Sequence, residues 1–224
     1  MSERSDAVED RFLDDLALGL QPVSQFQIWH LWAGAGVGLL VACAAIIAIF
    51  GPRPEMLGLI HGVMPTHLVV MAKPLLFLVT GVAALWGMSD LVRPEGRLNW
   101  RSLALILLAL FVVLVALVVQ ILQQNLSDLL TSLVGGDVPC AVTIFLGGMI
   151  ALFLLWWLWL RNAATMHPTM LGALSGLATA SLMAAAYAIH CNMDAPIYIL
   201  LIYGLSVGLF VALAALLGRR FLRW

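Results

Sequence analysis

Two cysteines at the ends of long apolar runs are the residues of this chain best suited to chemistry. Cys140 opens the fourth run and Cys191 closes the fifth, so a chain that crosses a membrane at every run places both thiols on one side. His190 precedes Cys191, and an adjacent imidazole can lower the pKa of a thiol or ligate a metal beside it. The sequence therefore predicts a sensing site of Cys140, Cys191 and His190 that responds to an oxidant or binds a thiophilic metal.

Two plainer interpretations of the thiol pair stay open. It could be a permanent structural disulfide, or two unrelated side chains that only fill space. His61, Met64 and His67 lie in an outer segment and could complete a soft metal site, or they could be ordinary loop residues. Cys43 lies deep in the first run, where we expect a small packing side chain.

The rest of the chain offers little for catalysis. The sequence contains no Cys-x-x-Cys, zinc-protease motif, phosphate loop or nucleophile elbow. We therefore expect no enzymatic activity and no cofactor. Lys73, near the outer end of the second run, is the ionisable residue closest to a membrane interior. It could reach the surface or pair with Asp128, Asp137 or Asp194.

The composition places the chain among membrane proteins. Hydrophobic residues make up 63% of it and charged residues 10%, with a mean hydropathy of +1.04, which no soluble domain of this size could bury. A helix needs about 20 apolar residues to cross a hydrocarbon core, and no alternating pattern of barrel strands appears. The prediction is an all-α membrane protein, a bundle of six transmembrane helices preceded by a short cytoplasmic amphipathic helix. The six runs are approximately 28–50, 68–87, 102–121, 140–160, 168–190 and 197–217.

The cations indicate how the chain is oriented. If both termini are cytoplasmic, nine of the eleven Lys and Arg residues fall in cytoplasmic segments, and only Arg53 and Lys73 fall outside. The prediction is a cytoplasmic tail over 1–27, a membrane domain over 28–217 and a basic cytoplasmic tail over 218–224. The thiols then face an oxidising compartment.

Small residues recur at every fourth position in two runs. They are Gly172, Gly176, Ala180, Ala184 and Ala188 in the fifth run, and Gly204, Gly208 and Ala212 in the sixth. Such rows let helix backbones approach closely. We therefore expect both rows to be helix contact faces, with Cys191 near the face of the fifth run.

The N-terminal tail has the pattern of a partner-binding helix. Its apolar residues follow helical spacing and its acidic residues flank them. The residues expected to bind a partner are Phe12, Leu13, Leu16, Leu20, Asp14 and Asp15. An acidic helix is repelled by anionic lipid, so the tail is expected to fold in the groove of a partner protein. The alternative is a solvated leader without a partner.

Several stretches resemble the NrsF family of bacterial transmembrane anti-sigma factors. They are Asp137-Val138-Pro139-Cys140, Ala188-Ile189-His190-Cys191, Asp194-Ala195-Pro196, the closing 217–224, and in the tail Leu13-Asp14-Asp15-Leu16 with Leu20-Gln21-Pro22-Val23. The resemblance covers essentially the whole chain and includes both cysteines.

The resemblance implies a function for the chain. Members of the family are six-span proteins of the inner membrane that hold an extracytoplasmic-function sigma factor inactive. They respond to oxidants or thiophilic metals through the paired cysteines. The implied partners are a sigma factor and the lipid bilayer, with no nucleic acid bound directly. A membrane thiol oxidoreductase, or a small transporter, is the alternative, and an oxidoreductase would need a second dithiol or a quinone site.

Overall fold

The structure, a computed structural model, describes most of the chain beyond the tail. The described residues are 28–56, 69–93, 95–125, 127–129, 131, 138–160, 163 and 165–222. The predicted tail over 1–27, with all of its expected partner-binding residues, lies outside them, as do His61, Met64, His67 and Asp137.

Long helices account for nearly all of the described residues, which include no strand. The elements are α2 (Ile28–Phe50), α4 (Val69–Leu91), α5 (Trp100–Gln123), α7 (Val138–Leu158), α8 (Pro168–Ala188), α9 (Pro196–Tyr198), the π-helical η2 (Ile199–Gly204) and α10 (Leu205–Phe221). Six helices are long and apolar enough to cross a membrane, and the last runs through α9, η2 and α10 as Pro196–Phe221. The predicted all-α, six-span fold is confirmed.

Local sequence explains where several helices begin. Pro168 opens α8 and Pro139 lies in the first turn of α7, where the missing N–H of proline costs nothing. Asn99 caps α5, because its side-chain oxygen accepts a hydrogen bond from Arg101 N at 3.0 Å.

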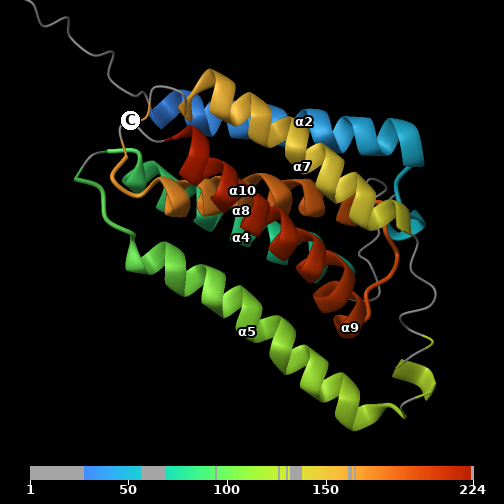
Figure 1. The fold of residues 1–224 in the computed structure, drawn as a ribbon. Helices are drawn as coiled ribbons and strands as arrows, with labels where there is room; N and C mark the ends of the chain where they lie inside the picture. The colour runs from blue at the N-terminus through green and yellow to red at the C-terminus, as the bar shows by residue number, and fades with distance from the viewer. Residues whose placement is uncertain are drawn as a thin grey trace, which may run out of the picture.

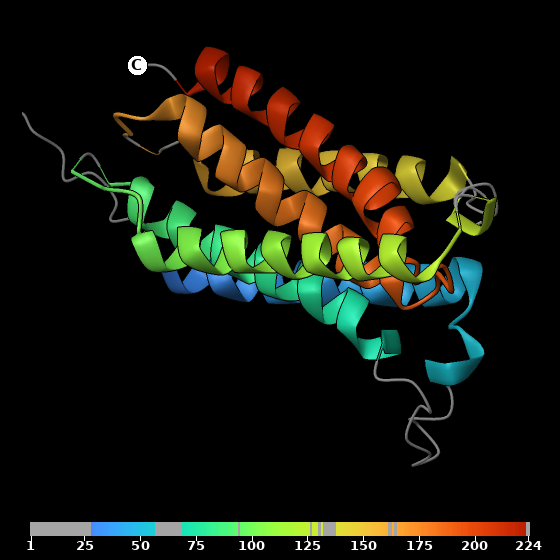
Figure 2. The same ribbon diagram turned by 90° about the horizontal axis from the view of Figure 1, so that it is seen from below.

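Successive helices run in opposite directions and end at two common levels (Figure 1; Figure 2). α2 begins and α10 ends at one end of the bundle, whereas α7 begins and α8 ends at the other. α5 lies away from α2 and α7, and it contacts α4 and, near its own end, α9. The arrangement brings residues 140 and 191 to the same end, as the alternation of runs predicted.

α8 is the centre of the bundle and contacts α2, α4, α7 and α10. Its small residues are what allow this. A Cβ added at Gly172 would lie 2.5 Å from Ala214 O, and one added at Gly176 would lie 2.4 Å from Ala214 Cβ. The predicted contact face of the fifth run is therefore confirmed.

The contact face predicted for the sixth run is wrong. Gly208 is exposed, and a Cβ added there would meet nothing within 4 Å. The residues of α10 that face α8 are instead buried ones such as Phe210, Ala214 and Gly218. Lipid is as apolar as a helix neighbour, so a row of small residues on an apolar helix does not tell which surrounding it faces.

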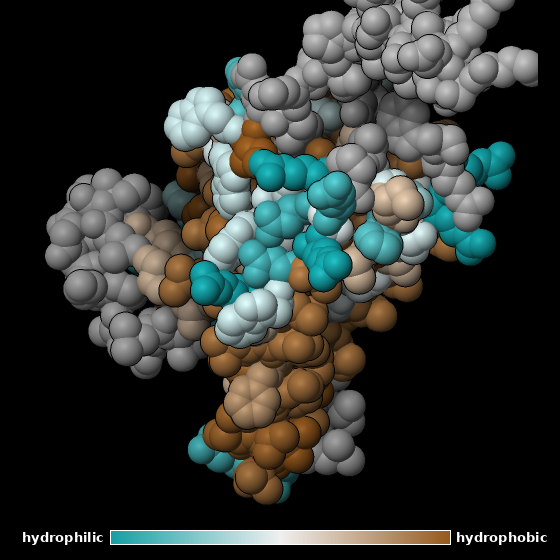
Figure 3. Space-filling model, turned by 90° about the vertical axis from the view of Figure 1, so that its left-hand side faces the viewer, coloured by the Kyte–Doolittle hydropathy of each residue, from teal (hydrophilic) through white to brown (hydrophobic). Residues whose placement is uncertain are grey.

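Hydrophilic side chains gather at the end of the bundle where the described chain finishes. Figure 3 shows this end, with hydrophilic residues on the end face and hydrophobic ones along the sides of the helices. This distribution is that of a multi-pass membrane protein, whose helix sides contact lipid and whose ends contact water.

Candidate thiol site

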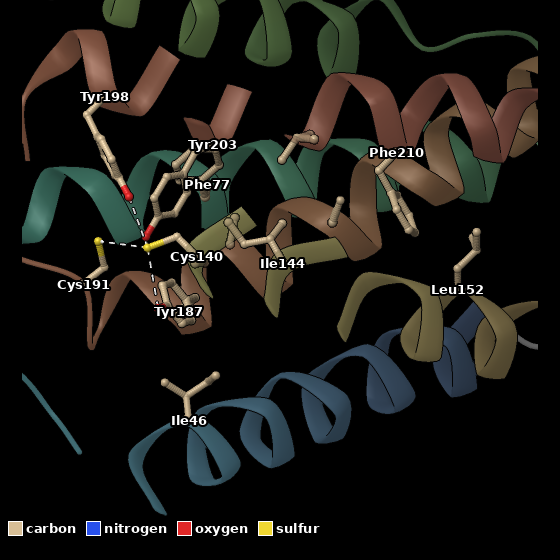
Figure 4. Packing of buried hydrophobic residues seen from close by; sticks show 14 of the residues in the cluster. Ile46, Phe77, Cys140, Ile144, Leu152, Tyr187, Cys191, Tyr198, Tyr203 and Phe210 are labelled. Carbon is tan, nitrogen blue, oxygen red and sulfur yellow. Dashed lines mark hydrogen bonds between the residues drawn. The ribbon is translucent and has the colours of Figure 1, made fainter. Parts of the chain in front are cut away.

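Cys140 and Cys191 lie together at the end of the bundle opposite the described C-terminus. Cys140 is in the first turn of α7, and Cys191 follows α8, where its N–H donates to Tyr187 O at 3.1 Å. Both thiols are free and buried, with 3.9 Å between the two Sγ atoms (Figure 4). Because a disulfide needs about 2.05 Å, the structure holds a reduced dithiol that a small displacement would close.

Tyrosine hydroxyls surround the thiol of Cys140. Tyr198 Oη donates to its Sγ at 3.2 Å, and the Cys140 thiol lies 3.5 Å from Tyr187 Oη. Tyr203 is 0% exposed, its hydroxyl has no hydrogen-bond partner among the described residues, and it points toward the thiols (Figure 4). The last span therefore brings two phenol groups to the thiol pair.

Two buried cations hold the segment that carries Cys191. Arg53 donates to Cys191 O at 3.2 Å and pairs with both carboxylate oxygens of Asp194 at 3.2 and 2.8 Å. Lys73, from α4, donates to Met193 O at 2.9 Å and lies 3.9 Å from Asp194 Oδ1. Asp194, one of the partners considered for Lys73 from the sequence, therefore lies beside it.

Electrostatics make the two thiols unequal. The hydrogen bond from the Cys140 thiol lowers the pKa of Cys191, burial opposes this, and the charge of Lys73 lowers it further. Burial disfavours the charged form of Arg53, but the hydrogen bonds and negative charges of Asp194 and Glu55 together outweigh that effect and raise the pKa of Arg53. Arg53 therefore remains a cation beside the backbone of Cys191.

His190 lies at the same site, but its imidazole contacts the segment after α2 and neighbouring aromatic rings. Its Nδ1 is 2.8 Å from Gly51 O, to which it donates, and its ring packs against Phe50 and Tyr187 at 5.2 and 5.7 Å between centroids. The described residues contain no cluster of three or more His, Cys, Asp or Glu side chains that could hold a metal ion.

A pocket of about 300 Å³ connects the thiols to the surface. Cys140, Cys191 and His190 line it together with Arg53 and Tyr198. The three predicted site residues thus line one pocket. Cys43 lines a separate apolar pocket with Met71 and Ala185.

Reasoning from the sequence missed several residues of the site. The tyrosines fit equally well in an interfacial belt, and Arg53 was assigned only to an outer segment. Gln120 was also missed, although its Oε1 accepts from Ile197 N at 3.0 Å and so fixes the start of the last span. Gln120 and Lys73 are polar residues within apolar runs, and this unusual placement is the feature of the sequence that could have indicated the site at this end of the bundle.

Fold and site together define a multi-pass membrane protein with a buried dithiol at one end of its helices. A family model described as NrsF, negative regulator of sigma F, matches residues 16–224. The chain belongs to this family, and its class is that of a negative regulator of a sigma factor. No curated protein and no solved structure matches the chain.

Proposed function

We propose that this chain is an anti-sigma factor of the bacterial inner membrane. It binds an extracytoplasmic-function sigma factor through its N-terminal tail and releases it when Cys140 and Cys191 are oxidised. The observation that carries the proposal is the pair of free thiols 3.9 Å apart in one pocket. A permanent disulfide is disfavoured by that spacing.

The geometry of the thiol pair favours an oxidant as the stimulus. Two free thiols with 3.9 Å between their Sγ atoms need only a small displacement to form a disulfide. A membrane thiol oxidoreductase would need a second dithiol. The third and last cysteine of the sequence, Cys43, lines a different pocket.

The orientation follows from the distribution of positive charge. With both termini cytoplasmic, the tail meets its partner inside the cell while the thiols face the periplasm. The described C-terminal helix ends in Arg219 and Arg220 at the end of the bundle where α2 begins, as expected for the cytoplasmic side.

α7 links the thiols to the start of the helix that follows the tail. Cys140 lies in its first turn, and Trp159 follows its last residue. A Cβ added at Gly34 of α2 would lie 2.4 Å from the ring of Trp159, and Leu31 shares a buried cluster with Leu155. Closing the disulfide moves the first turn of α7, and through these contacts the displacement reaches α2 and the tail.

Thiol trapping tests this function. We expect both thiols to be reduced at rest and to form a disulfide after hydrogen peroxide treatment, with release of the sigma factor from membranes that contain the protein. Cys140→Ser and Cys191→Ser should retain the sigma factor under peroxide, and Cys43→Ser should behave as the unsubstituted protein. Complete oxidation at rest, together with a normal response in Cys140→Ser, would exclude the proposed switch.

A further inference from the structure

Lys73 is the only lysine of the chain, and it is enclosed beside the thiol pair. Its side chain is 0% exposed, and its ammonium donates to Met193 O at 2.9 Å and lies 3.5 Å from Cys191 O. It also lies over the ring of Tyr203, 4.4 Å from the centroid. Carbonyl dipoles and a ring face solvate an ammonium, but they do not neutralise its charge.

Two buried cations, Arg53 and Lys73, lie beside one carboxylate, that of Asp194, whose side chain is 18% exposed. Asp194 Oδ2 is 2.8 Å from a guanidinium nitrogen of Arg53, whereas its Oδ1 is 3.9 Å from Lys73 Nζ, too far for a hydrogen bond. Glu55 contacts Arg53 from the surface, with a side chain 47% exposed. The carboxylate is therefore committed to Arg53, and the charge of Lys73 calls for a second anion.

The surroundings of Cys191 suit a thiolate. The Cys140 thiol donates to its sulfur at 3.9 Å, and Lys73 attracts negative charge on it. The buried hydroxyl of Tyr203 points toward the thiols and has no acceptor among the described residues, and an unmade hydrogen bond is costly for a buried hydroxyl. The contacts of Cys140 Sγ are instead with the hydroxyls of Tyr198 and Tyr187 and with the sulfur of Cys191.

We propose that Cys191 is the attacking sulfur of the pair, that Cys140 is the resolving sulfur, and that Lys73 is the positioning residue that holds Cys191 as a thiolate. The assignment rests on the proposed function, and it specifies which thiol reacts first in the oxidation step. The ionisable groups that face Cys191 from the surrounding elements are Arg53, Lys73, Cys140, Tyr187, His190, Asp194, Tyr198 and Tyr203.

The oxidant required is a hydroperoxide. The Cys191 thiolate attacks the terminal oxygen of the hydroperoxide, so that an S–O bond forms while the O–O bond breaks. The alkoxide or hydroxide that leaves takes up a proton. Cys140 Sγ then attacks the Cys191 sulfenic acid, an S–S bond forms and the S–O bond breaks. The departing hydroxide takes the Cys140 proton as water. Two thiols are oxidised and one peroxide is reduced.

Trapping the sulfenic acid tests the order of attack. In full-length protein carrying Cys43→Ser, only the pair can react, and dimedone marks a sulfenic acid after hydrogen peroxide treatment. We expect a dimedone adduct on Cys191 in the Cys140→Ser variant. The adduct on Cys140 in the Cys191→Ser variant should form at least about tenfold more slowly, because each pKa unit changes the thiolate fraction about tenfold. Equal rates, faster reaction at Cys140, or no adduct on either cysteine would overturn the assignment.

The pH dependence of alkylation tests the role of Lys73. In the Cys140→Ser background, Lys73→Met should move the midpoint of Cys191 alkylation to a pH higher by about 1 to 3, and Lys73→Arg should restore it. Asp194→Asn should move it lower, because it removes the anion that competes for the cations. If the substitutions only loosened the structure, the alkylation midpoints of the Lys73→Met and Asp194→Asn variants would both move toward that of a free thiol, about 8.5. Such parallel shifts, or no shift in either variant, would refute the role of Lys73.

The two proposals can fail separately. Equal dimedone rates together with sigma-factor release by peroxide would leave the regulatory function standing and remove the assignment of Cys191. Rapid, Lys73-dependent oxidation of Cys191 without any effect on sigma-factor binding would support the assignment of Cys191 and remove the regulatory function.

Discussion

At the scale of residues, buried charge fixes the backbone that carries Cys191. Arg53 reaches it from the segment after α2 and Lys73 reaches it from α4, and both contact the carbonyl oxygen of Cys191 and the carboxylate of Asp194. Burying charges costs several kcal/mol apiece unless they are paired and hydrogen-bonded. The network therefore tolerates one arrangement of residues 191–194, and the thiol of Cys191 keeps a defined position relative to Cys140.

Removing the shared carboxylate should destabilise the protein strongly. Asp194→Ala removes the hydrogen-bonded anion of buried Arg53 and a negative charge 3.9 Å from buried Lys73, and we expect a loss of about 3 kcal/mol in the free energy of unfolding. Glu55→Ala is the matched control, because Glu55 also pairs with Arg53 but from an exposed position, where ion pairs contribute little. Thermal unfolding of the purified proteins in detergent measures both. Similar melting temperatures for the two variants would contradict the importance given to Asp194.

The sequence predicted part of this site for physical reasons. The thiol pair was predictable because both cysteines lie at the ends of spans, and alternation of spans fixes their side of the membrane. The partner of Lys73 was not, because alternation of the runs assigns three aspartates to segments on the same side of the membrane, and the packing of α4 against the end of α8 is what brings Asp194 to Lys73. Hydrogen bonds from the tyrosines depend on the rotation of the last span, which the sequence leaves open.

At the scale of elements, close backbone approach sets the position of α8. Gly172 and Gly218 face each other where α8 and α10 cross, and Trp156 of α7 donates to Ser175 of α8 at 3.0 Å. The spans were predictable within a few residues because the thickness of a bilayer fixes their length. Their contact faces were only partly predictable, because an apolar helix in lipid has no polar side to mark which face is outward.

Two glycine substitutions distinguish the true contact face from the expected one. Gly172→Ala places a Cβ 2.5 Å from Ala214 O, a backbone atom that cannot yield, and should cost about 1–3 kcal/mol. Gly208→Ala meets nothing within 4 Å and should be neutral or stabilise the helix by about 0.5–1 kcal/mol. Thermal unfolding in detergent measures the difference, and greater damage from Gly208→Ala would place the face of α10 where the sequence suggested.

At the scale of the whole molecule, the bundle separates the thiols from the start of α2 by the length of its helices. The proposed function requires that the two ends face different compartments. A reporter active only in the cytoplasm should be active when fused after Trp224 and inactive when inserted at Asp137, just before α7. The same activity at both positions would contradict the topology, and with it the exposure of the thiols to the periplasm.

The contact between Gly34 and Trp159 is where the proposed signal passes to the tail-bearing helix. Gly34→Leu drives a side chain into the Trp159 ring, because a Cβ at Gly34 already lies 2.4 Å from it, whereas a Cβ at Gly36, two residues further along α2, meets nothing within 4 Å. We expect Gly34→Leu to leave peroxide oxidation of Cys140 and Cys191 unchanged while sigma-factor binding no longer follows the thiol state. Gly36→Leu should respond normally. Co-purification of the sigma factor before and after peroxide measures the response, and we expect the Phe12→Asp, Leu16→Asp double variant to give the fully released value. Normal peroxide-driven release from Gly34→Leu would show that the signal does not travel through α7 and α2.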